Sequence, residues 1–347
     1  MPAGFAGRVV DWQQAHGRNS LPWQNTRDPY RVWLSEIMLQ QTQVATVLGY
    51  YSRFLQCFPD VAALAAAPLD DVLGSWSGLG YYSRARNLHR CAQDVVALHG
   101  GQFPRSAQVL QTLPGIGRST AAAIASFCFG ERAAILDGNV KRVLTRVLGF
   151  GADLASATNE RSLWAQAEAL LPGENVAREA IPRYTQGLMD LGAGVCLTRN
   201  PSCMICPVRE LCTALREGAP EKYPVRTRKQ KRGAQSLWLL KARSTDGAVW
   251  LEKRPATGIW AGLYCLPAFH SRAELEAAVA QASRADLRDD PAFVHVLTHK
   301  DLHLHPVTGV VAAPPVGAAR GAWFACDEWT RLGLPAPVRR LLEAGER

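Results

Sequence analysis

Two carboxylates in the sequence have surroundings that favour opposite protonation states. Glu36 is the only charge between Val32 and Leu48, and its neighbours are apolar. Burial among such neighbours raises a carboxyl pKa and keeps the group protonated, as a general acid requires. Asp137 stands at a predicted helix start, where backbone N–H groups favour the ionised form. Such a pair can cleave a glycosidic bond through an oxocarbenium-like state. The ordinary alternatives are a polar helix face for Glu36 and helix capping for Asp137.

Four cysteines form a second chemical group with the spacing of a metal site. They follow the pattern C-x6-C-x2-C-x5-C, at Cys196, Cys203, Cys206 and Cys212. Four thiolates bind either zinc or a [4Fe–4S] cluster, and the spacing alone leaves that choice open. We expect the other five cysteines to be small core residues: Cys57, Cys91, Cys128, Cys265 and Cys326.

A glycine-containing turn supplies a third candidate site. The run LPGIGRS, residues 113–119, lies between two helical patterns. Gly115 and Gly117 let the backbone turn tightly and direct N–H groups outward at the start of the second helix. Such a turn can bind one DNA phosphate without reading sequence, although an ordinary helix–helix turn explains the same run.

Composition limits the class of protein that positions these residues. The chain has 347 residues, 48% hydrophobic and 20% charged, with a net charge of +9. Its length suggests two domains, and its basic excess favours a nucleic-acid partner. We find no signal peptide and no apolar run of the roughly 20 residues needed to span a membrane. We therefore expect a cytoplasmic protein without membrane association, in which the nine cysteines do not form disulfides.

The character of the chain changes near residue 220. Residues 1–216 show helical spacing of apolar residues, with helix starts at Asp28-Pro29 and Ser106. Residues 217–234 form a basic, proline-containing connector that we expect to be exposed. Residues 235–347 alternate strand and helix patterns. In that part we predict a hairpin turn at Asp246-Gly247, a helix over 273–282, a strand over 295–304 and a last helix over 338–343.

Taken together, the motifs resemble those of the adenine DNA glycosylases of the MutY type. The resemblance is carried by LSEIMLQQTQV, GLGYYSRARNL, LPGIGRSTAAAI, ILDGNVKRVL and the four-cysteine loop. It implies an all-α helix–hairpin–helix glycosylase domain, followed by a smaller α+β Nudix-like domain. The catalytic domain would be residues 1–216, with a six-helix part at 27–130 and an iron–sulfur part at 1–26 and 131–216. The recognition domain would be residues 235–347.

The resemblance also implies the cofactor, the partner and the reaction. The four thiols would hold a [4Fe–4S] cluster. The substrate would be double-stranded DNA that contains adenine mispaired with 8-oxoguanine or guanine. Hydrolysis would remove the adenine and leave an abasic site, and we expect the enzyme to act as a monomer.

Individual roles follow from the matched motifs. Glu36 matches the general acid, Asp137 the carboxylate that stabilises the sugar cation, and Asn139 the residue that orients this carboxylate and the water. Gln186 aligns with a position that reads the flipped adenine, although a surface glutamine is the ordinary explanation. Gln41 and Tyr81 match residues that wedge into the duplex, which offsets part of the stacking lost on base flipping.

Ser119 distinguishes between two kinds of glycosylase. Related bifunctional enzymes place a lysine here, which forms a Schiff base and cuts the strand, and a hydroxyl cannot do so. Ser119 and the additional C-terminal domain therefore argue against an endonuclease III-like lyase acting on oxidised pyrimidines. A non-catalytic mismatch-binding protein or an iron–sulfur redox sensor is a further alternative. The presence of both Glu36 and Asp137 argues against it.

The C-terminal half departs from two patterns. The helix candidate at 272–279 has too few carboxylates, at the wrong spacing, for the Nudix REXXEEXG motif, so we expect no nucleotide hydrolysis. The family's Phe-Ser-His recognition loop reads Leu297-Thr298-His299 here; His299 and the hydroxyl of Thr298 are retained, and the aromatic ring is lost. The histidines at 295, 303 and 305 could bind a metal, but their alternate positions on one predicted strand fit a polar strand face better.

Overall fold

The computed structural model describes residues 4–174, 179–227, 232–316 and 321–344. The chain forms two compact units, which we describe separately. Unit 1 consists of residues 1–51, 60–65 and 90–229, and unit 2 of residues 52–59, 66–89 and 230–347. The predicted domain boundaries at 216/217 and 234/235 stay predictions. None of the described helices is long and apolar enough to cross a bilayer.

Unit 1 is helical, as predicted. It contains α1 (Phe5–His16), α2 (Pro29–Leu39), α7 (Ala107–Leu110), α8 (Arg118–Ile124), α9 (Gly138–Leu148), α10 (Ala157–Ala169), α11 (Ala180–Asp190) and α12 (Thr213–Arg216). Helices α3 (Val44–Cys57), α4 (Val61–Ala66) and α6 (Ser83–His99) have residues in both units. Two π-helical turns, η1 (Ala125–Phe129) and η2 (Leu191–Val195), extend α8 and α11. Short 3-10 turns are η3 (Cys203–Ile205), η4 (Arg209–Leu211) and η5 (Pro220–Lys222).

The predicted helix starts are confirmed by their caps. Asp28 accepts a hydrogen bond from the Tyr30 N–H, and Pro29 occupies the first turn of α2, where its missing N–H costs nothing. Ser106 accepts one from the Val109 N–H at the start of α7. These caps fix where the helices enter the core, and they are local enough to be read from sequence.

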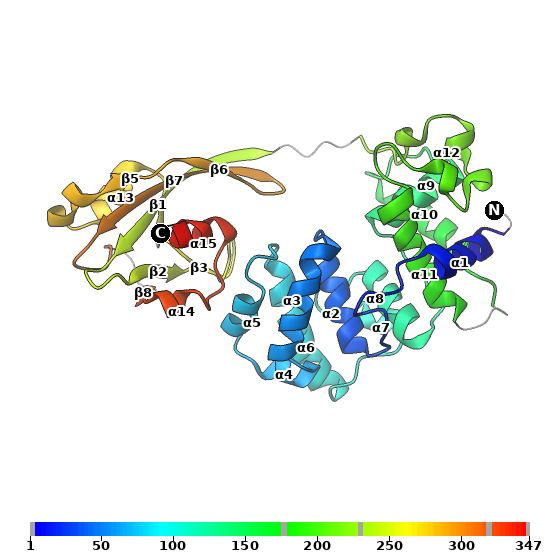
Figure 1. Cartoon of the computed structure of the whole chain (residues 1–347), viewed down its shortest axis with the longest axis horizontal. Helices are drawn as coiled ribbons and strands as arrows, with labels where there is room; N and C mark the ends of the chain where they lie inside the picture. The colour runs from blue at the N-terminus through cyan, green and yellow to red at the C-terminus, as the bar shows by residue number, and fades with distance from the viewer. Residues whose placement is uncertain (1–3, 175–178, 228–231, 317–320, 345–347) are drawn as a thin grey trace. The chain divides into compact units, whose positions relative to one another are not determined.

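Helices α1, α9, α10 and α11 pack around one apolar core in unit 1 (Figure 1). Phe5 of α1 meets Tyr184 of α11 edge-on, with ring centroids 6.3 Å apart. Gly187 lets the two helices approach closely, since a β-carbon there would lie 2.7 Å from Val9. Both helices lead directly into the candidate site described below.

Unit 2 is built on a mixed sheet in which β1 and β7 run parallel over eleven residues each. Its strands are β1 (Gly233–Arg243), β2 (Val249–Lys253), β3 (Tyr264–Cys265), β4 (Ala268–Phe269), β5 (Arg288–Asp289), β6 (Phe293–Val296), β7 (Lys300–Val310) and β8 (Gly321–Phe324). The main strand order is β3-β2-β1-β7-β5. Helices are α5 (Leu69–Ser75), α13 (Arg272–Ala278), α14 (Cys326–Trp329) and α15 (Ala336–Glu343), with a 3-10 turn η6 (Gln281–Asp286).

The β1–β2 hairpin confirms the turn predicted at Asp246-Gly247. The two strands pair antiparallel, and Gly247 has a φ of +90°, which a residue without a side chain adopts freely. The predicted helix over 273–282 is shorter than expected, because α13 ends at Ala278 and η6 follows it.

The single strand predicted over 295–304 is wrong. β6 ends at Val296 and β7 begins at Lys300, and the chain reverses between them with a Leu297 N–H to Lys300 O hydrogen bond of 2.8 Å. Because of this turn, the prediction that the three histidines share one polar strand face is wrong. His295 is paired with the fully buried Leu302 and faces the same side of the sheet, whereas His303 is exposed.

Two further expectations need correction. Cys91 and Cys265 are buried and Cys128 is partly buried, but Cys57 and Cys326 are exposed rather than in the core. The connector, predicted to be exposed throughout, is partly fastened to unit 1. The Leu154 N–H donates to the carbonyl of Val225 at 3.1 Å, and Thr227 bonds Asp153.

Candidate active site and base-recognition surface

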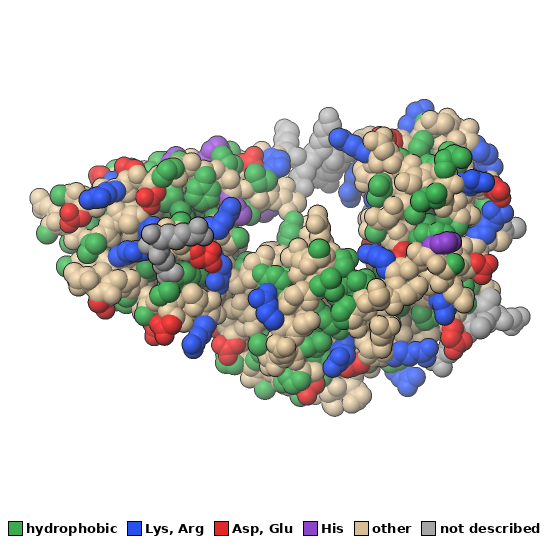
Figure 2. Space-filling model, in the orientation of Figure 1, with side chains coloured by type: hydrophobic (Ala, Val, Ile, Leu, Met, Phe, Trp, Pro, Cys, Tyr) green, Lys and Arg blue, Asp and Glu red, His purple; other side chains and the backbone are tan. Residues whose placement is uncertain are grey.

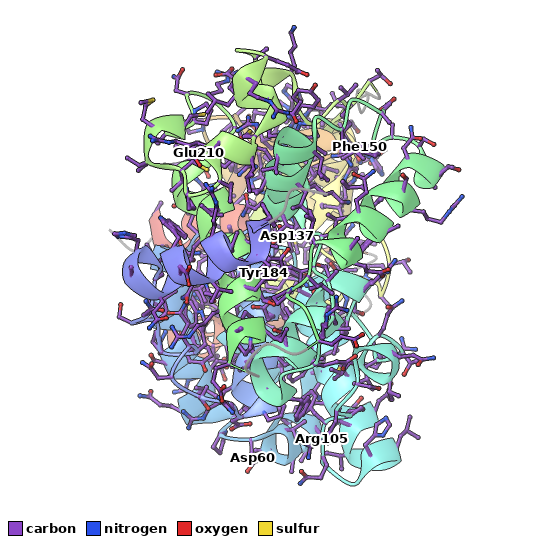
Figure 3. All side chains as sticks on the ribbon, turned by 90° about the vertical axis from the view of Figure 1, so that its right-hand side faces the viewer. Asp60, Arg105, Asp137, Phe150, Tyr184 and Glu210 are labelled. Carbon is purple, nitrogen blue, oxygen red and sulfur yellow. The ribbon has the colours of Figure 1, made fainter. Side chains whose placement is uncertain are left out.

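Six of the residues singled out from the sequence line one cleft of about 1170 Å³ in unit 1. They come from separate segments: Glu36 from α2, Ser119 from α8, Asn139 from α9 and Gln186 from α11, with Gln41 and Asp137 on the loops before α3 and α9. In Figure 3, Asp137 lies between the end of unit 1 labelled by Glu210 and the end labelled by Arg105.

Glu36 projects from a helix whose other residues are mostly buried. Loss of solvation, and to a smaller extent the nearby charge of Asp137, together raise its pKa to about 8. A pKa near 8 leaves the carboxyl group protonated at neutral pH. The physical condition that the sequence suggested for a general acid is therefore met.

Asp137 is the N-cap of α9, where its Oδ1 accepts a hydrogen bond from the Val140 N–H at 2.8 Å. Ser119 holds the segment that leads to it, because the Ser119 hydroxyl oxygen accepts from the Leu136 N–H at 3.0 Å. The cap orients the carboxylate. Asp137 therefore caps α9, as the sequence indicated, and also lines the cleft.

Asn139 is held by contacts that the sequence did not reveal. Arg142, one turn further along α9, donates from Nη2 to Asn139 Oδ1 at 2.9 Å and to the Gly192 carbonyl at 2.6 Å. Its Nε donates to the carbonyl of Cys196 at 2.7 Å. One guanidinium therefore connects the cleft to the first cysteine of the four-cysteine loop.

The amide of Gln186 is fixed by Asp190, one turn along α11. Its Nε2 donates to Asp190 Oδ1 at 2.9 Å. The same carboxylate accepts from the Arg18 Nε at 2.6 Å and from the Arg18 backbone N–H at 2.9 Å. The side chain of Asp190 is only 3% exposed. Sequence reasoning missed Asp190, and its one signal was a charge within the apolar run LMDLG.

All four predicted cysteine ligands line a second, small pocket in unit 1. Its remaining wall is largely apolar and includes Val143, Val195 and Val208. Among the residues described, no group of three His, Cys, Asp or Glu side chains is arranged to bind a single metal ion. The donor set and the shared pocket suit a larger inorganic group held by four thiolates.

Arg146 is a buried cation that lines this pocket. It is 2% exposed and donates from Nη1 to Cys196 Sγ at 3.3 Å and to the Leu197 carbonyl at 2.6 Å. Nη2 donates to the Thr198 carbonyl. These hydrogen bonds to carbonyl groups and a sulfur offset the cost of burying the guanidinium. They form only while the loop that begins at Cys196 keeps this conformation. Figure 2 shows further Lys and Arg side chains around the surface near α12.

In unit 2, Tyr81 is presented on a loop with an unusual backbone. Gly78, Gly80 and Tyr81 all have positive φ angles, and that of Tyr81 is +50°, a conformation that disfavours side chains. The buried Arg84 braces the loop by donating to the carbonyl of Gly80 at 3.2 Å, and its guanidinium lies 5.5 Å from the Tyr81 ring. Tyr81 itself is 45% exposed.

The hydroxyl groups of Tyr81 and Thr298 lie 3.4 Å apart. Thr298 and His299 are both exposed in the turn between β6 and β7, whereas Leu297 packs partly buried against the core of the sheet. Leu297, which stands where the family pattern has an aromatic residue, therefore faces the core. The two retained polar side chains are exposed to solvent. Thr298 lies beside Tyr81, and His299 follows Thr298 in the chain.

Helix α5 is joined to the sheet part of unit 2 by close contacts. A β-carbon at Gly74 would lie 2.2 Å from the carbonyl oxygen of Arg331, and one at Gly333 would lie 2.8 Å from Leu73 Cβ. Lys253 forms an ion pair with Asp70 at 2.6 Å. These contacts fix the loop that carries Tyr81 with respect to the turn that carries Thr298.

The glycine turn lies at the surface of unit 1. Gly115 and Gly117 are exposed between α7 and α8, and Gly115 has a φ of +77°. The side chain of Arg118 is drawn aside, with its guanidinium 3.9 Å from the ring centroid of Trp164. The backbone of the turn is therefore accessible, and phosphate binding there stays a prediction.

Known proteins are similar in sequence to both parts of this chain. Residues 34–166 match the HhH-GPD superfamily of base excision DNA repair proteins, and residues 238–344 match the NUDIX domain. The chain is 35% identical over 346 residues to the adenine DNA glycosylase of Buchnera aphidicola subsp. Acyrthosiphon pisum, covering 98% of this chain and 97% of the relative. It is 44% identical over 223 residues to human adenine DNA glycosylase, covering 60% and 39% of the two chains.

Solved structures are similar to the helical part. A thermostable thymine-DNA glycosylase superposes with a TM-score of 0.54 at 29% identity, covering 61% of this chain and 95% of that one. An endonuclease III bound to DNA superposes with a TM-score of 0.50 at 21% identity, covering 61% and 94%. At that identity the second similarity shows the fold alone. The predicted fold class is confirmed.

Proposed function

This chain belongs to the adenine DNA glycosylases, and we propose that it removes adenine paired with 8-oxoguanine or guanine in double-stranded DNA. The enzyme class follows from the family. The mispairs and the residue roles are our proposal. The observation that carries it is the cleft in which a carboxyl of pKa about 8, on Glu36, lies near a helix-capping carboxylate, on Asp137.

The reaction breaks the bond between the sugar C1′ and adenine N9. Glu36 donates its proton to adenine N7, so the base leaves as a neutral molecule. Asp137 stabilises the positive charge that develops on the sugar. A water molecule oriented with the help of Asn139 then adds to C1′ and gives a proton to the Glu36 carboxylate, which restores the acid. An abasic site and free adenine result.

Ser119 makes the proposed enzyme monofunctional. Its hydroxyl accepts the Leu136 N–H and supports the approach to Asp137. Strand cleavage by a lyase needs an amine that attacks C1′ and forms an imine, which a hydroxyl cannot do. We therefore propose that the abasic strand leaves the enzyme intact.

We propose that Tyr81, Thr298 and His299 recognise the base opposite adenine. The exposed ring of Tyr81 can stack in the duplex, while the Thr298 hydroxyl and the His299 imidazole offer polar contacts to the 8-oxoguanine edge. Gln41, on the cleft wall and with a φ of +57°, would fill space beside the flipped nucleotide. Together these contacts would offset the cost of a few kcal/mol for flipping a base.

We propose that Cys196, Cys203, Cys206 and Cys212 hold a [4Fe–4S] cluster. Their arrangement around one apolar-walled pocket supports this assignment. When bound, the cluster would cross-link the loop from residue 196 to residue 212. Arg142 and Arg146 would then transmit the loop's fixed shape to Asn139 and α9.

The decisive experiment uses a duplex with a single 8-oxoguanine:adenine pair. The purified protein is incubated with it, and the adenine strand is analysed with and without alkali. We expect a break at the adenine position only after alkali. Absence of any alkali-dependent break refutes adenine removal, and a break without alkali refutes the monofunctional assignment. A thymine glycol duplex tests the alternative substrate class, and we expect it to stay intact.

A further inference from the structure

We propose that Asp190 makes Gln186 a one-sided reader that accepts purines with a 6-amino group and rejects those with a 6-oxo group. This inference rests on the proposed function and deepens it. It assigns a positioning role to Asp190, which neither touches the base nor takes part in bond cleavage. It concerns the choice of the base that is removed in the cleft, which is separate from recognition of the base opposite adenine.

The argument begins with hydrogen-bond chemistry. A glutamine amide can present either its NH2 group or its carbonyl oxygen to a ligand, and rotation by about 180° exchanges the two. An ionised carboxylate has only acceptors. The contact of 2.9 Å between Gln186 and Asp190 therefore requires the amide nitrogen to face Asp190. The orientation follows from the donor–acceptor pairing and does not depend on telling nitrogen from oxygen.

Asp190 can impose this orientation because it is itself immobilised. Arg18 donates to both of its oxygens, through the side-chain Nε and the backbone N–H. With 3% of its side chain exposed, the carboxylate has little access to water that would replace the Gln186 donor. The i, i+4 spacing on α11 places the two side chains on one helix face.

The amide oxygen of Gln186 is left to read the ligand. Gln186 lines the cleft, and its Oε1 accepts no hydrogen bond from any residue in the described part of the chain. An acceptor without a protein partner among the described residues of the cleft can pair with the 6-amino group of adenine. It meets the 6-carbonyl of guanine, 8-oxoguanine or hypoxanthine oxygen to oxygen, which is unfavourable. The cleft would thus exclude the guanine-type base of the same mispair from excision.

The test compares excision of adenine and hypoxanthine, each placed opposite 8-oxoguanine, as a ratio of single-turnover rates. Dividing each ratio by that of Gln186→Leu removes the intrinsic difference between the leaving groups. We expect the wild type to favour adenine by at least roughly tenfold on this scale. A corrected ratio near one for the wild type overturns the inference without needing any variant of Asp190.

Asp190→Asn supplies the second arm. An asparagine can turn its NH2 toward Gln186, so the Gln186 amide can rotate and donate to a 6-oxo group. We expect the preference for adenine to fall toward that of Gln186→Leu, and no further change when both substitutions are combined. Asp11→Asn, an equal charge change at an exposed site on α1, should keep the wild-type ratio. A folded Asp190→Asn protein with an unchanged ratio overturns the proposal.

These outcomes separate the inference from the proposed function. If the wild type removes no adenine at all, the proposed function fails. If it removes adenine but the ratios do not respond to Gln186 or Asp190, only the one-sided reader fails.

Discussion

Gly192 lies so close to Asn139 that a β-carbon at 192 would come within 2.6 Å of Asn139 Cβ. The backbone of Asn139 would be 3.2 Å away, so the clash could not be relieved by rotating a side chain. Glycine at 192 is therefore a condition for Asn139 to reach the cleft. The π-helical turn η2 that contains Gly192 ends next to Cys196.

We predict that Gly192→Ala impairs adenine excision more than it impairs folding. The added methyl group displaces the first turn of α9, and with it Asn139 and the Asp137 cap. We expect a loss of about 100-fold in single-turnover rate, as for displacement of a group that acts in the transition state. Gly194→Ala in the same turn is the matched control, because nothing lies within 4 Å of its β-carbon. Equal activity of the two variants would contradict this role.

The raised pKa of Glu36 predicts how activity depends on pH. Since the acid must carry its proton, the single-turnover rate should fall as pH rises through about 8. Glu36→Gln should retain binding to the mispaired duplex but lose at least about 100-fold in rate. A rate profile measured from pH 6 to pH 9 checks this. A variant with near-normal turnover would place the acid elsewhere.

The same shift predicts an effect on stability. Between its ordinary pKa of 4.5 and the folded value of about 8, the unfolded chain loses the Glu36 proton while the folded chain keeps it. The contribution of Glu36 to folding therefore becomes less favourable as pH rises across this interval and then levels off. Glu36→Gln should be more stable than the wild type at pH 8, by up to a few kcal/mol. Equal urea midpoints at pH 8 would contradict it.

Tyr81 and Thr298 should act as a pair in choosing the base opposite adenine. We expect Tyr81→Phe and Thr298→Val each to lower the preference for 8-oxoguanine over guanine by about 3- to 10-fold, the value of one hydrogen bond. Because the two hydroxyls lie 3.4 Å apart, the double variant should lose less than the product of the single effects. Excision opposite guanine serves as the internal control. Multiplicative losses would show that the hydroxyls act independently.

The four-cysteine pocket predicts a selective effect of cysteine substitution. Cys203→Ser should lower iron content and visible absorbance and reduce the thermal midpoint, because the loop loses its cross-link. Cys57→Ser, at an exposed cysteine outside the pocket, should leave all three unchanged. Normal iron content in Cys203→Ser would contradict the proposed ligand set.

Several features could be predicted because their signals are local. The caps at Asp28 and Asp137 depend on neighbouring residues, and the environment of Glu36 follows from the apolar residues on its own helix. The four cysteines fall within one loop. In each case the residues that determine the structure are close in sequence.

Other features could not be predicted, since they depend on contacts between distant segments. Asp190 accepts a hydrogen bond from Arg18, and Gly192 packs closely against Asn139, although each pair is far apart in the sequence. The face occupied by His295 was predicted wrongly, because the turn at 297–299 was not recognised and one strand was expected instead of two. The exposure of Cys57 and Cys326 likewise depends on which side of a helix meets a partner.

The close approach of Gly74 to Arg331 and of Gly333 to Leu73 has a consequence for protein engineering. A chimera that replaces only residues 235–347 with the corresponding domain of a relative would set Gly74 and Leu73 against a new partner surface. A side chain in place of Gly333 would meet Leu73 and shift the recognition turn away from Tyr81. Successful grafting therefore requires residues 66–89 to be transplanted together with the C-terminal domain, as one inherited block.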